Sequence, residues 1–290
     1  MSGAPDGWPA AVAAWAEGRP DIRALVQIGS RVQEGAQPDA WSDYDYHLIT
    51  TEPARYRDGS FASELGPCWA SGSQTAFGNS TKVTAVYGGA LEADFIVVTN
   101  WEIRIALAAL LLPALEPLWP PPLRAGVASL RIVAAPGWRI IKGGADWARR
   151  YRRIHALSAP MAHGEYLRLG GEFWTQLVWA AKKAQRGEFR ASQRALHLHL
   201  IEAALRMMQE EASLEGRASG PLSRRAEEWL SPDRAAATAF ASSPDRAALM
   251  AGLRRLAEAF SASSASVAKA RGWPNPDRAE VRGWLASLPG

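Results

Sequence analysis

Two aspartates, Asp43 and Asp45, are separated by one residue at the start of a stretch that becomes apolar and ends near Thr50. The stretch predicts a β-strand, in which residues two apart point to the same side, about 7 Å from each other. Neighbouring carboxylates repel each other, and a bound cation relieves that repulsion. Carboxylate oxygens are the hard ligands that Mg²⁺ prefers. The pair therefore predicts a magnesium site.

A phosphate-binding turn is predicted a short distance before the pair. The apolar run 24–28 predicts a buried strand, and Gly29, Ser30 and Arg31 follow it. Glycine lets a phosphate approach the backbone closely, and the serine hydroxyl and N–H can donate to it. We expect Arg31 to reach the same phosphates, although it could also be a solvated charge.

A third acidic residue, Asp94, lies in the apolar segment 91–98, which predicts a further strand. The order of these features resembles the signature of the nucleotidyltransferase superfamily that includes DNA polymerase beta. The fuller string, from Gly29-Ser30-Arg31 to Trp41-Ser42-Asp43-Tyr44-Asp45, resembles the bacterial aminoglycoside 6-adenylyltransferases, which are streptomycin adenylyltransferase-like.

This resemblance implies an enzyme that moves AMP from ATP to a hydroxyl of a small molecule and releases pyrophosphate. It implies two Mg²⁺ ions held by Asp43, Asp45 and Asp94, with ATP as co-substrate. The acceptor would be an aminoglycoside such as streptomycin. The implied fold class is α/β: a nucleotidyltransferase-type mixed sheet with flanking helices, followed by a C-terminal helical-bundle domain.

Glu172 is the candidate general base, because Gly171-Glu172-Phe173-Trp174 resembles the Asn-Glu-Phe-Trp string of those adenylyltransferases. A carboxylate there could take the proton of an acceptor hydroxyl. The alternative is a glutamate favoured by the dipole at a helix N-terminus. Three lysines are candidate phosphate ligands, or else solvated charges: Lys142, Lys182 and Lys183. His47 shares the predicted face of the aspartates, where it could line the site or cap the sheet.

The elements that must position these residues fall into two predicted domains. A catalytic α/β domain spans 1–150 and a helical substrate-binding domain spans 151–290, because helix-forming composition dominates after Gly143-Gly144. Further strands are predicted over 82–87 and within 131–142, and helices over 9–17, 101–112, 172–186, 191–211, 234–241 and 246–261.

Composition limits the classes of function. The formal net charge of +4 is too diffuse to predict nucleic-acid binding. A single cysteine, Cys68, excludes an intrachain disulfide and a cysteine zinc site. The most apolar window, 105–115, is too short to span a bilayer. We expect a cytoplasmic protein without membrane contacts, acting as a monomer or weak dimer on a nucleoside triphosphate and a hydroxylated small molecule.

The charge also keeps alternatives open. Aminoglycosides are polycations and favour an acidic pocket, whereas this chain is net basic. Another metabolite or natural product, a protein or an RNA end could be the acceptor. A non-catalytic nucleotide-binding module of a toxin–antitoxin pair is a candidate of another class, which the complete set of three carboxylates argues against.

Overall fold

The computed structural model describes residues 7–33, 38–39, 41–76, 80–154, 161–217, 225–275 and 277–290. The chain forms two compact units, Met1–Leu157 and Ser158–Gly290. Each unit has its own buried core, so each is described separately.

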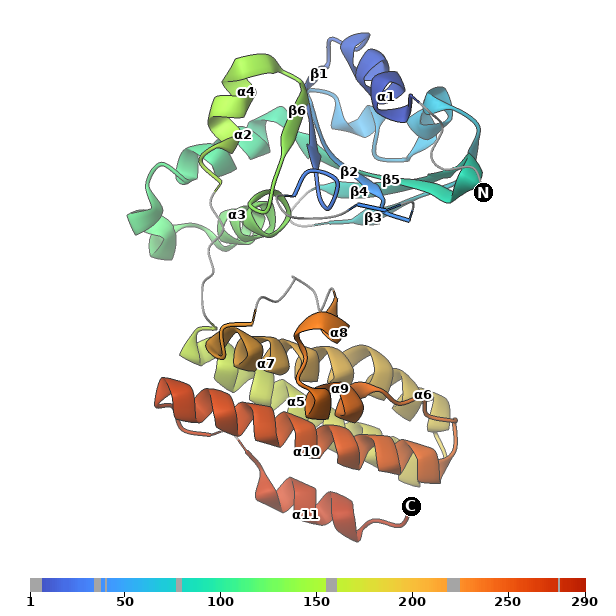
Figure 1. The fold of residues 1–290 in the computed structure, drawn as a ribbon, viewed down its shortest axis with the longest axis vertical. Helices are drawn as coiled ribbons and strands as arrows, with labels where there is room; N and C mark the ends of the chain where they lie inside the picture. Colours follow the sequence, from blue (N-terminus) through green and yellow to red (C-terminus); the bar gives the residue numbers. More distant parts are fainter. Residues whose placement is uncertain are drawn as a thin grey trace. The chain divides into compact units, whose positions relative to one another are not determined.

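A mixed six-stranded sheet forms the centre of the first unit, with the strand order β3-β4-β5-β2-β1-β6 (Figure 1). Only β2 and β5 run parallel; the other neighbouring strands are antiparallel. The strands are β1 (Ile22–Ile28), β2 (Tyr44–Thr50), β3 (Cys68–Thr75), β4 (Thr81–Tyr87), β5 (Leu91–Thr99) and β6 (Arg139–Lys142). The predicted fold class, a mixed sheet with flanking helices, is confirmed.

Alternation along the strands separates the two faces of this sheet. Tyr46 and Leu48 of β2 face a core that contains Trp8 and Trp15 of helix α1 (Trp8–Glu17). Ile49 belongs to the opposite core, which helices α2 (Asn100–Ala109), α3 (Pro121–Ala134) and α4 (Gly144–Tyr151) cover. Short 3₁₀ helices complete the unit: η1 (Pro53–Arg55), η2 (Ser60–Leu65), η3 (Gly88–Ala90) and η4 (Pro113–Leu118).

The second unit is helical, as expected (Figure 1). Its core contains Phe173 and Phe260, whose stacked rings lie 3.8 Å apart. Its elements are α5 (His163–Gln185), α6 (Phe189–Arg194), the π-helical turn η5 (Ala195–Leu200), α7 (Ile201–Leu214), α8 (Ala226–Trp229), α9 (Pro232–Thr238), α10 (Arg246–Arg271) and α11 (Ala279–Ser287). Among the described residues of both units, no helix is long and apolar enough to cross a membrane.

Several predicted boundaries are wrong. The helix expected to begin at Glu172 begins at His163, because Tyr166 and Leu169 continue its buried stripe towards the N-terminus. Of the segment 131–142, within which strands were predicted, the first residues form the last turn of α3, and one strand, β6, occupies Arg139–Lys142. Burial of an amphipathic face outweighs the weak helix propensity of the glycines in α5.

Candidate active site

The three predicted carboxylates come together at one end of the sheet. Asp45 and Asp94 lie directly opposite each other on the parallel strands β2 and β5, and Asp43 immediately precedes β2. One oxygen from each of the three lies within 4.8 Å of the others. Asp94 is buried, whereas Asp43 and Asp45 are half-buried. The structure therefore assembles a set of oxygen ligands that opens towards solvent.

The Gly29 turn lies against this cluster, because Ile28 pairs with Asp45 at the end of β1. Gly29 has a φ of +78°, and a Cβ atom added to it would lie 2.1 Å from Oδ2 of Asp45. The backbone N–H groups of Val32 and Gln33 donate to the Gly29 carbonyl at 3.1 Å. Glycine is strongly favoured in this turn, because both the backbone conformation and the contact with the carboxylate disfavour a side chain.

Ser30 and Arg31 differ in the contacts that their side chains make within the protein. The Ser30 hydroxyl has no hydrogen-bond partner within the described part of the chain. The Arg31 guanidinium donates to the carbonyls of Ser42 at 2.6 Å and Asp43 at 3.0 Å, and it stacks 3.9 Å from the Tyr44 ring. Arg31 therefore braces the backbone before β2, while its contact with a triphosphate stays a prediction.

Lys82 of β4 is a site residue that the sequence prediction missed. Its ammonium lies 2.5 Å from Oδ2 of Asp94, and the Thr84 hydroxyl donates to the other oxygen at 2.5 Å. Thr84 is directly opposite Asp94 in the antiparallel β4–β5 pair, and Lys82 is two residues away on the same face. The alternation of side chains along the predicted strand 82–87 places Lys82 and Thr84 on one face, which could have indicated this contact.

The donor set fits Mg²⁺. Oxygens on opposite sides of one Mg²⁺ ion are about 4.2 Å apart, and two ions that share carboxylates lie about 3.5–4 Å apart. Oxygens that spread over at most 4.8 Å match such a site. Because Lys82 already contacts Asp94, a metal ion that uses the same oxygen must displace the ammonium.

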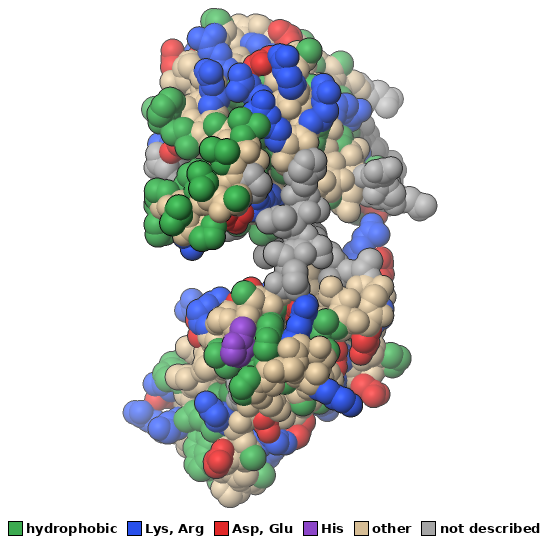
Figure 2. Space-filling model, turned by 90° about the vertical axis from the view of Figure 1, so that its left-hand side faces the viewer, with side chains coloured by type: hydrophobic (Ala, Val, Ile, Leu, Met, Phe, Trp, Pro, Cys, Tyr) green, Lys and Arg blue, Asp and Glu red, His purple; other side chains and the backbone are tan. Residues whose placement is uncertain are grey.

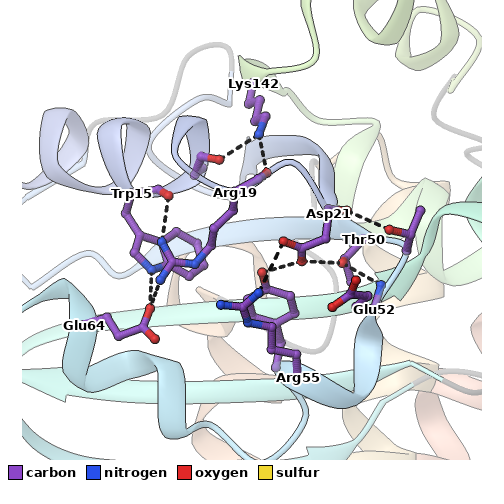
Figure 3. A network of polar contacts seen from close by, with 11 residues as sticks. Trp15, Arg19, Asp21, Thr50, Glu52, Arg55, Glu64 and Lys142 are labelled. Carbon is purple, nitrogen blue, oxygen red and sulfur yellow. Dashed lines mark hydrogen bonds and ion pairs between the residues drawn. The ribbon is translucent and has the colours of Figure 1, made fainter.

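Lys142 contacts the end of α1 and not the phosphate turn, and its role as a phosphate ligand stays a prediction. Its ammonium donates to the carbonyls of Ala16 at 2.7 Å and Arg19 at 2.6 Å, at the C-terminal end of α1 (Figure 3). Lys142 pairs with Leu25 in the middle of β1, whereas Gly29 follows the end of that strand. The ammonium is a second, charged donor to these carbonyls, which already accept the backbone N–H groups of Arg19 and Ile22, and it lies at the negative end of the dipole of α1.

The polar network around this lysine is structural. Asp21 accepts hydrogen bonds from Tyr56 at 2.5 Å and Thr50 at 3.1 Å, and Arg55 lies 3.7 Å away (Figure 3). Burial opposes ionisation of Asp21, but these donors outweigh it and keep the pKa of the carboxyl below its usual value.

His47 lies on the same face as the aspartates but inside the core. It is 3% exposed, and its Nδ1 is 2.8 Å from the hydroxyl of Tyr151 in α4. Burial lowers the pKa of His47 to about 4, so its ring is neutral at pH 7. It supports the sheet beside the site instead of lining the site.

The remaining candidates belong to the second unit. Glu172 is exposed in the middle of α5, with its carboxylate 2.8 Å from Arg168. The alternative of a glutamate at a helix N-terminus is therefore wrong. The Lys183 ammonium lies 2.5 Å from Glu188, and Lys182 is exposed. The roles of all three residues in catalysis or phosphate binding stay predictions.

Known proteins supply an independent comparison. The streptomycin adenylyltransferase family model matches residues 9–80, which include the Gly29 turn, Asp43 and Asp45. The expected resemblance is confirmed. With it, the expected class of enzyme, a nucleotidyltransferase, is supported over the stretch that carries the turn and the paired aspartates.

Solved structures were compared over nearly the whole chain. An aminoglycoside 6-adenyltransferase from Bacillus subtilis is 13% identical, with 96% of this chain and 97% of that chain covered and a TM-score of 0.43. A nucleotidyltransferase-like protein from Exiguobacterium sibiricum is also 13% identical, with 92% and 77% covered and a TM-score of 0.34. No curated protein matches at a significant level.

Proposed function

We propose that this protein is a Mg²⁺-dependent adenylyltransferase that moves AMP from ATP to a hydroxyl of a small molecule and releases pyrophosphate. The observation that carries the proposal is the convergence of Asp43, Asp45 and Asp94 within 4.8 Å, beside the Gly29 turn, whose backbone conformation and contact with Asp45 favour glycine. The family match over residues 9–80 supports the same reaction. We further propose a monomer or weak dimer that acts in the cytoplasm.

Each residue of the site has a defined part in this proposal. Asp43, Asp45 and Asp94 hold two Mg²⁺ ions, which when bound neutralise the triphosphate and stabilise the leaving pyrophosphate. Gly29 lets the Asp45 carboxylate pack against the turn, and the Ser30 hydroxyl, which has no partner among the described residues, donates a hydrogen bond to a phosphate. Arg31 keeps the backbone before β2 in place, so that the two aspartates reach the site together.

The reaction forms one bond and breaks one. The acceptor oxygen attacks the α-phosphorus, and the bond from that phosphorus to the bridging oxygen of pyrophosphate breaks. Glu172 is the residue that we assign to take the proton of the acceptor hydroxyl; its carboxylate is exposed, with Arg168 as its hydrogen-bond partner. Positioning and charge neutralisation supply most of the rate enhancement in such transfers.

An aminoglycoside such as streptomycin is the first choice of acceptor, on the strength of the family match. A hydroxylated acceptor without several positive charges is the second candidate. It is favoured because glutamates that could attract a polycation are already paired with arginines: Glu165 with Arg206, Glu172 with Arg168, Glu210 with Arg271 and Glu211 with Arg234. Such pairing leaves less negative potential for a cationic acceptor.

Mass spectrometry tests the proposal directly. The purified chain is incubated with Mg²⁺ and each of the four nucleoside triphosphates against a panel of aminoglycosides and neutral hydroxylated compounds. Asp45→Asn serves as the inactive control, and Asp233→Asn, a change at an exposed position of α9, as the matched active control.

We expect an acceptor that gains the mass of AMP with the native chain and Asp233→Asn, but not with Asp45→Asn. Modified neutral acceptors alone would replace the aminoglycoside by the second candidate. ATP binding without transfer to any acceptor, including RNA and protein, would favour the non-catalytic nucleotide-binding module.

A further inference from the structure

A separate pocket in the first unit has a volume of about 360 Å³. Three arginines from three different elements line it: Arg23 of β1, Arg104 of α2 and Arg150 of α4. No part of the proposed adenylyl transfer uses these residues. The pocket therefore needs an explanation of its own.

The strand register places this pocket away from the acidic cluster. Arg23 lies near the start of β1, whereas Gly29 follows its end. Thr51, which also lines the pocket, directly follows the C-terminal end of β2, whereas Asp45 lies near the start of that strand. At about 3.3 Å per residue, Asp45 and Thr51 are about 20 Å apart. The two sites occupy opposite ends of the sheet.

The charges in the pocket are unbalanced. Arg23 and Arg104 have no ion-pair or hydrogen-bond partner for their side chains within the described ranges. Asp146, the acidic residue of the lining, accepts hydrogen bonds from Arg150 at 2.9 Å and from Arg149 at 3.2 Å. These contacts, Arg150 first, lower the pKa of Asp146, so the carboxylate is ionised but already neutralised. Three arginines against one aspartate leave a formal charge of +2.

The surroundings strengthen this imbalance. Arg149 is exposed on α4. Figure 2 shows arginine and lysine side chains gathered over one part of the first unit, with few acidic ones among them. Like charges that converge without counter-ions repel one another, and a bound anion removes that cost. The pocket is thus prepared for an anionic ligand.

Its chemistry and size identify the class of ligand. Guanidinium groups present forked N–H donors that match phosphate oxygens. The Asn100 amide adds neutral donors, and Trp147 forms part of the wall. Pockets of about 300 Å³ or more hold small molecules of nucleotide size. We propose that this pocket binds a phosphate group of a small phosphorylated metabolite.

Calorimetry with inorganic pyrophosphate tests this second site. The full chain is titrated in EDTA, so that no divalent metal ion links the ligand to the acidic cluster. We expect the native chain to bind pyrophosphate. The double variant Arg23→Ala/Arg104→Ala should bind it at least about tenfold more weakly, because each hydrogen bond between a guanidinium and the anion contributes to the binding free energy.

Two controls locate the binding. Arg152→Ala/Arg153→Ala removes the same charge at the end of α4 without touching the pocket lining and should retain the native affinity. Ser30→Ala should also bind like the native chain, because it changes the phosphate turn at the other end of the sheet. Circular dichroism confirms that each variant is folded; both pocket arginines are exposed, so their loss leaves the core intact.

Three results would overturn the proposal: no pyrophosphate binding by the native chain, equal losses in the two arginine double variants, or binding of an RNA oligonucleotide but not of pyrophosphate. Loss of binding in Ser30→Ala would assign the anion to the phosphate turn instead. Because the titration needs neither Mg²⁺ nor an acceptor, its failure would leave the proposed adenylyl transfer untouched.

Discussion

Replacing Gly29 by alanine should disable the acidic site while leaving the sheet folded. The new Cβ would lie 2.1 Å from Oδ2 of Asp45, less than any real non-bonded contact, so the carboxylate must rotate away. The backbone φ of +78° adds strain of about 1–2 kcal/mol for any residue with a side chain. An off-rotamer Asp45 adds roughly 1 kcal/mol. We expect the free energy of unfolding of the first unit to fall by about 2–3 kcal/mol.

Gly144→Ala is the matched control. Gly144 has a φ of +63° in the same unit, but nothing lies within 4 Å of its added Cβ. It should therefore show the backbone strain of about 1–2 kcal/mol alone. The difference between the two variants isolates the collision with Asp45, which the backbone conformation cannot explain.

Denaturant unfolding followed by circular dichroism gives the stabilities, and calorimetry with Mg²⁺ and ATP gives the affinities of the folded fractions. We expect Gly29→Ala to bind Mg²⁺ at least about tenfold more weakly, because misplacing one of three ligands removes a charged contact. Gly144→Ala should bind Mg²⁺ like the native chain. Native Mg²⁺ affinity in Gly29→Ala would refute the reasoning that this turn fixes the Asp45 carboxylate.

Three further perturbations test other residues. Lys82→Met removes the ammonium that competes with a metal ion for Asp94. Mg²⁺ binding measured by calorimetry should become about fivefold tighter, since a partly exposed ion pair contributes about 1 kcal/mol. Weaker binding would mean that the lysine supports Mg²⁺ binding. Glu172→Gln should lower turnover about a hundredfold with unchanged ATP affinity, and unchanged turnover would remove Glu172 as the base. His47 titrates at about 4 in the folded chain and near its ordinary value when unfolded, so the unfolded state binds more protons between these pH values. Stability should therefore fall as the pH drops from about 6.5 to 4, by up to roughly 3 kcal/mol, and His47→Gln should flatten that slope in pH-dependent denaturation; an equal slope in both proteins would place the titration elsewhere.

The central strands were predictable because both of their faces are buried. β1, β2 and β5 appear in the sequence as apolar runs bounded by turns, and they lie side by side in the sheet. Side chains alternate along β5, so Phe95 lies on the opposite face from Asp94, in the α1 core. Burial on both sides leaves a strong and unambiguous pattern in the sequence.

The edges of the fold were not predictable in the same way. β3 is an edge strand whose residues are mostly exposed, so no apolar pattern marks it. Helix α3 begins at Pro121, within the proline-rich segment 117–122. Proline fits the first helical turn, where its missing N–H has no partner to lose. Local composition alone does not separate such a start from a loop.

In the site, too, contacts that are local in the sequence were predictable, whereas contacts that depend on strand pairing were not. The turn and the paired aspartates form one short motif, whereas Lys82 reaches Asp94 only through the β4–β5 register. That register follows from the tight turn at Gly88-Gly89, which pairs Tyr87 with Leu91 and so places Thr84 opposite Asp94. Opposite residues in an antiparallel pair share a face. Lys82, two positions before Thr84, therefore lies on the same face as the Asp94 carboxylate. The turn at Gly88-Gly89 thus carries information about the surroundings of the acidic cluster that a search for acidic residues alone cannot recover.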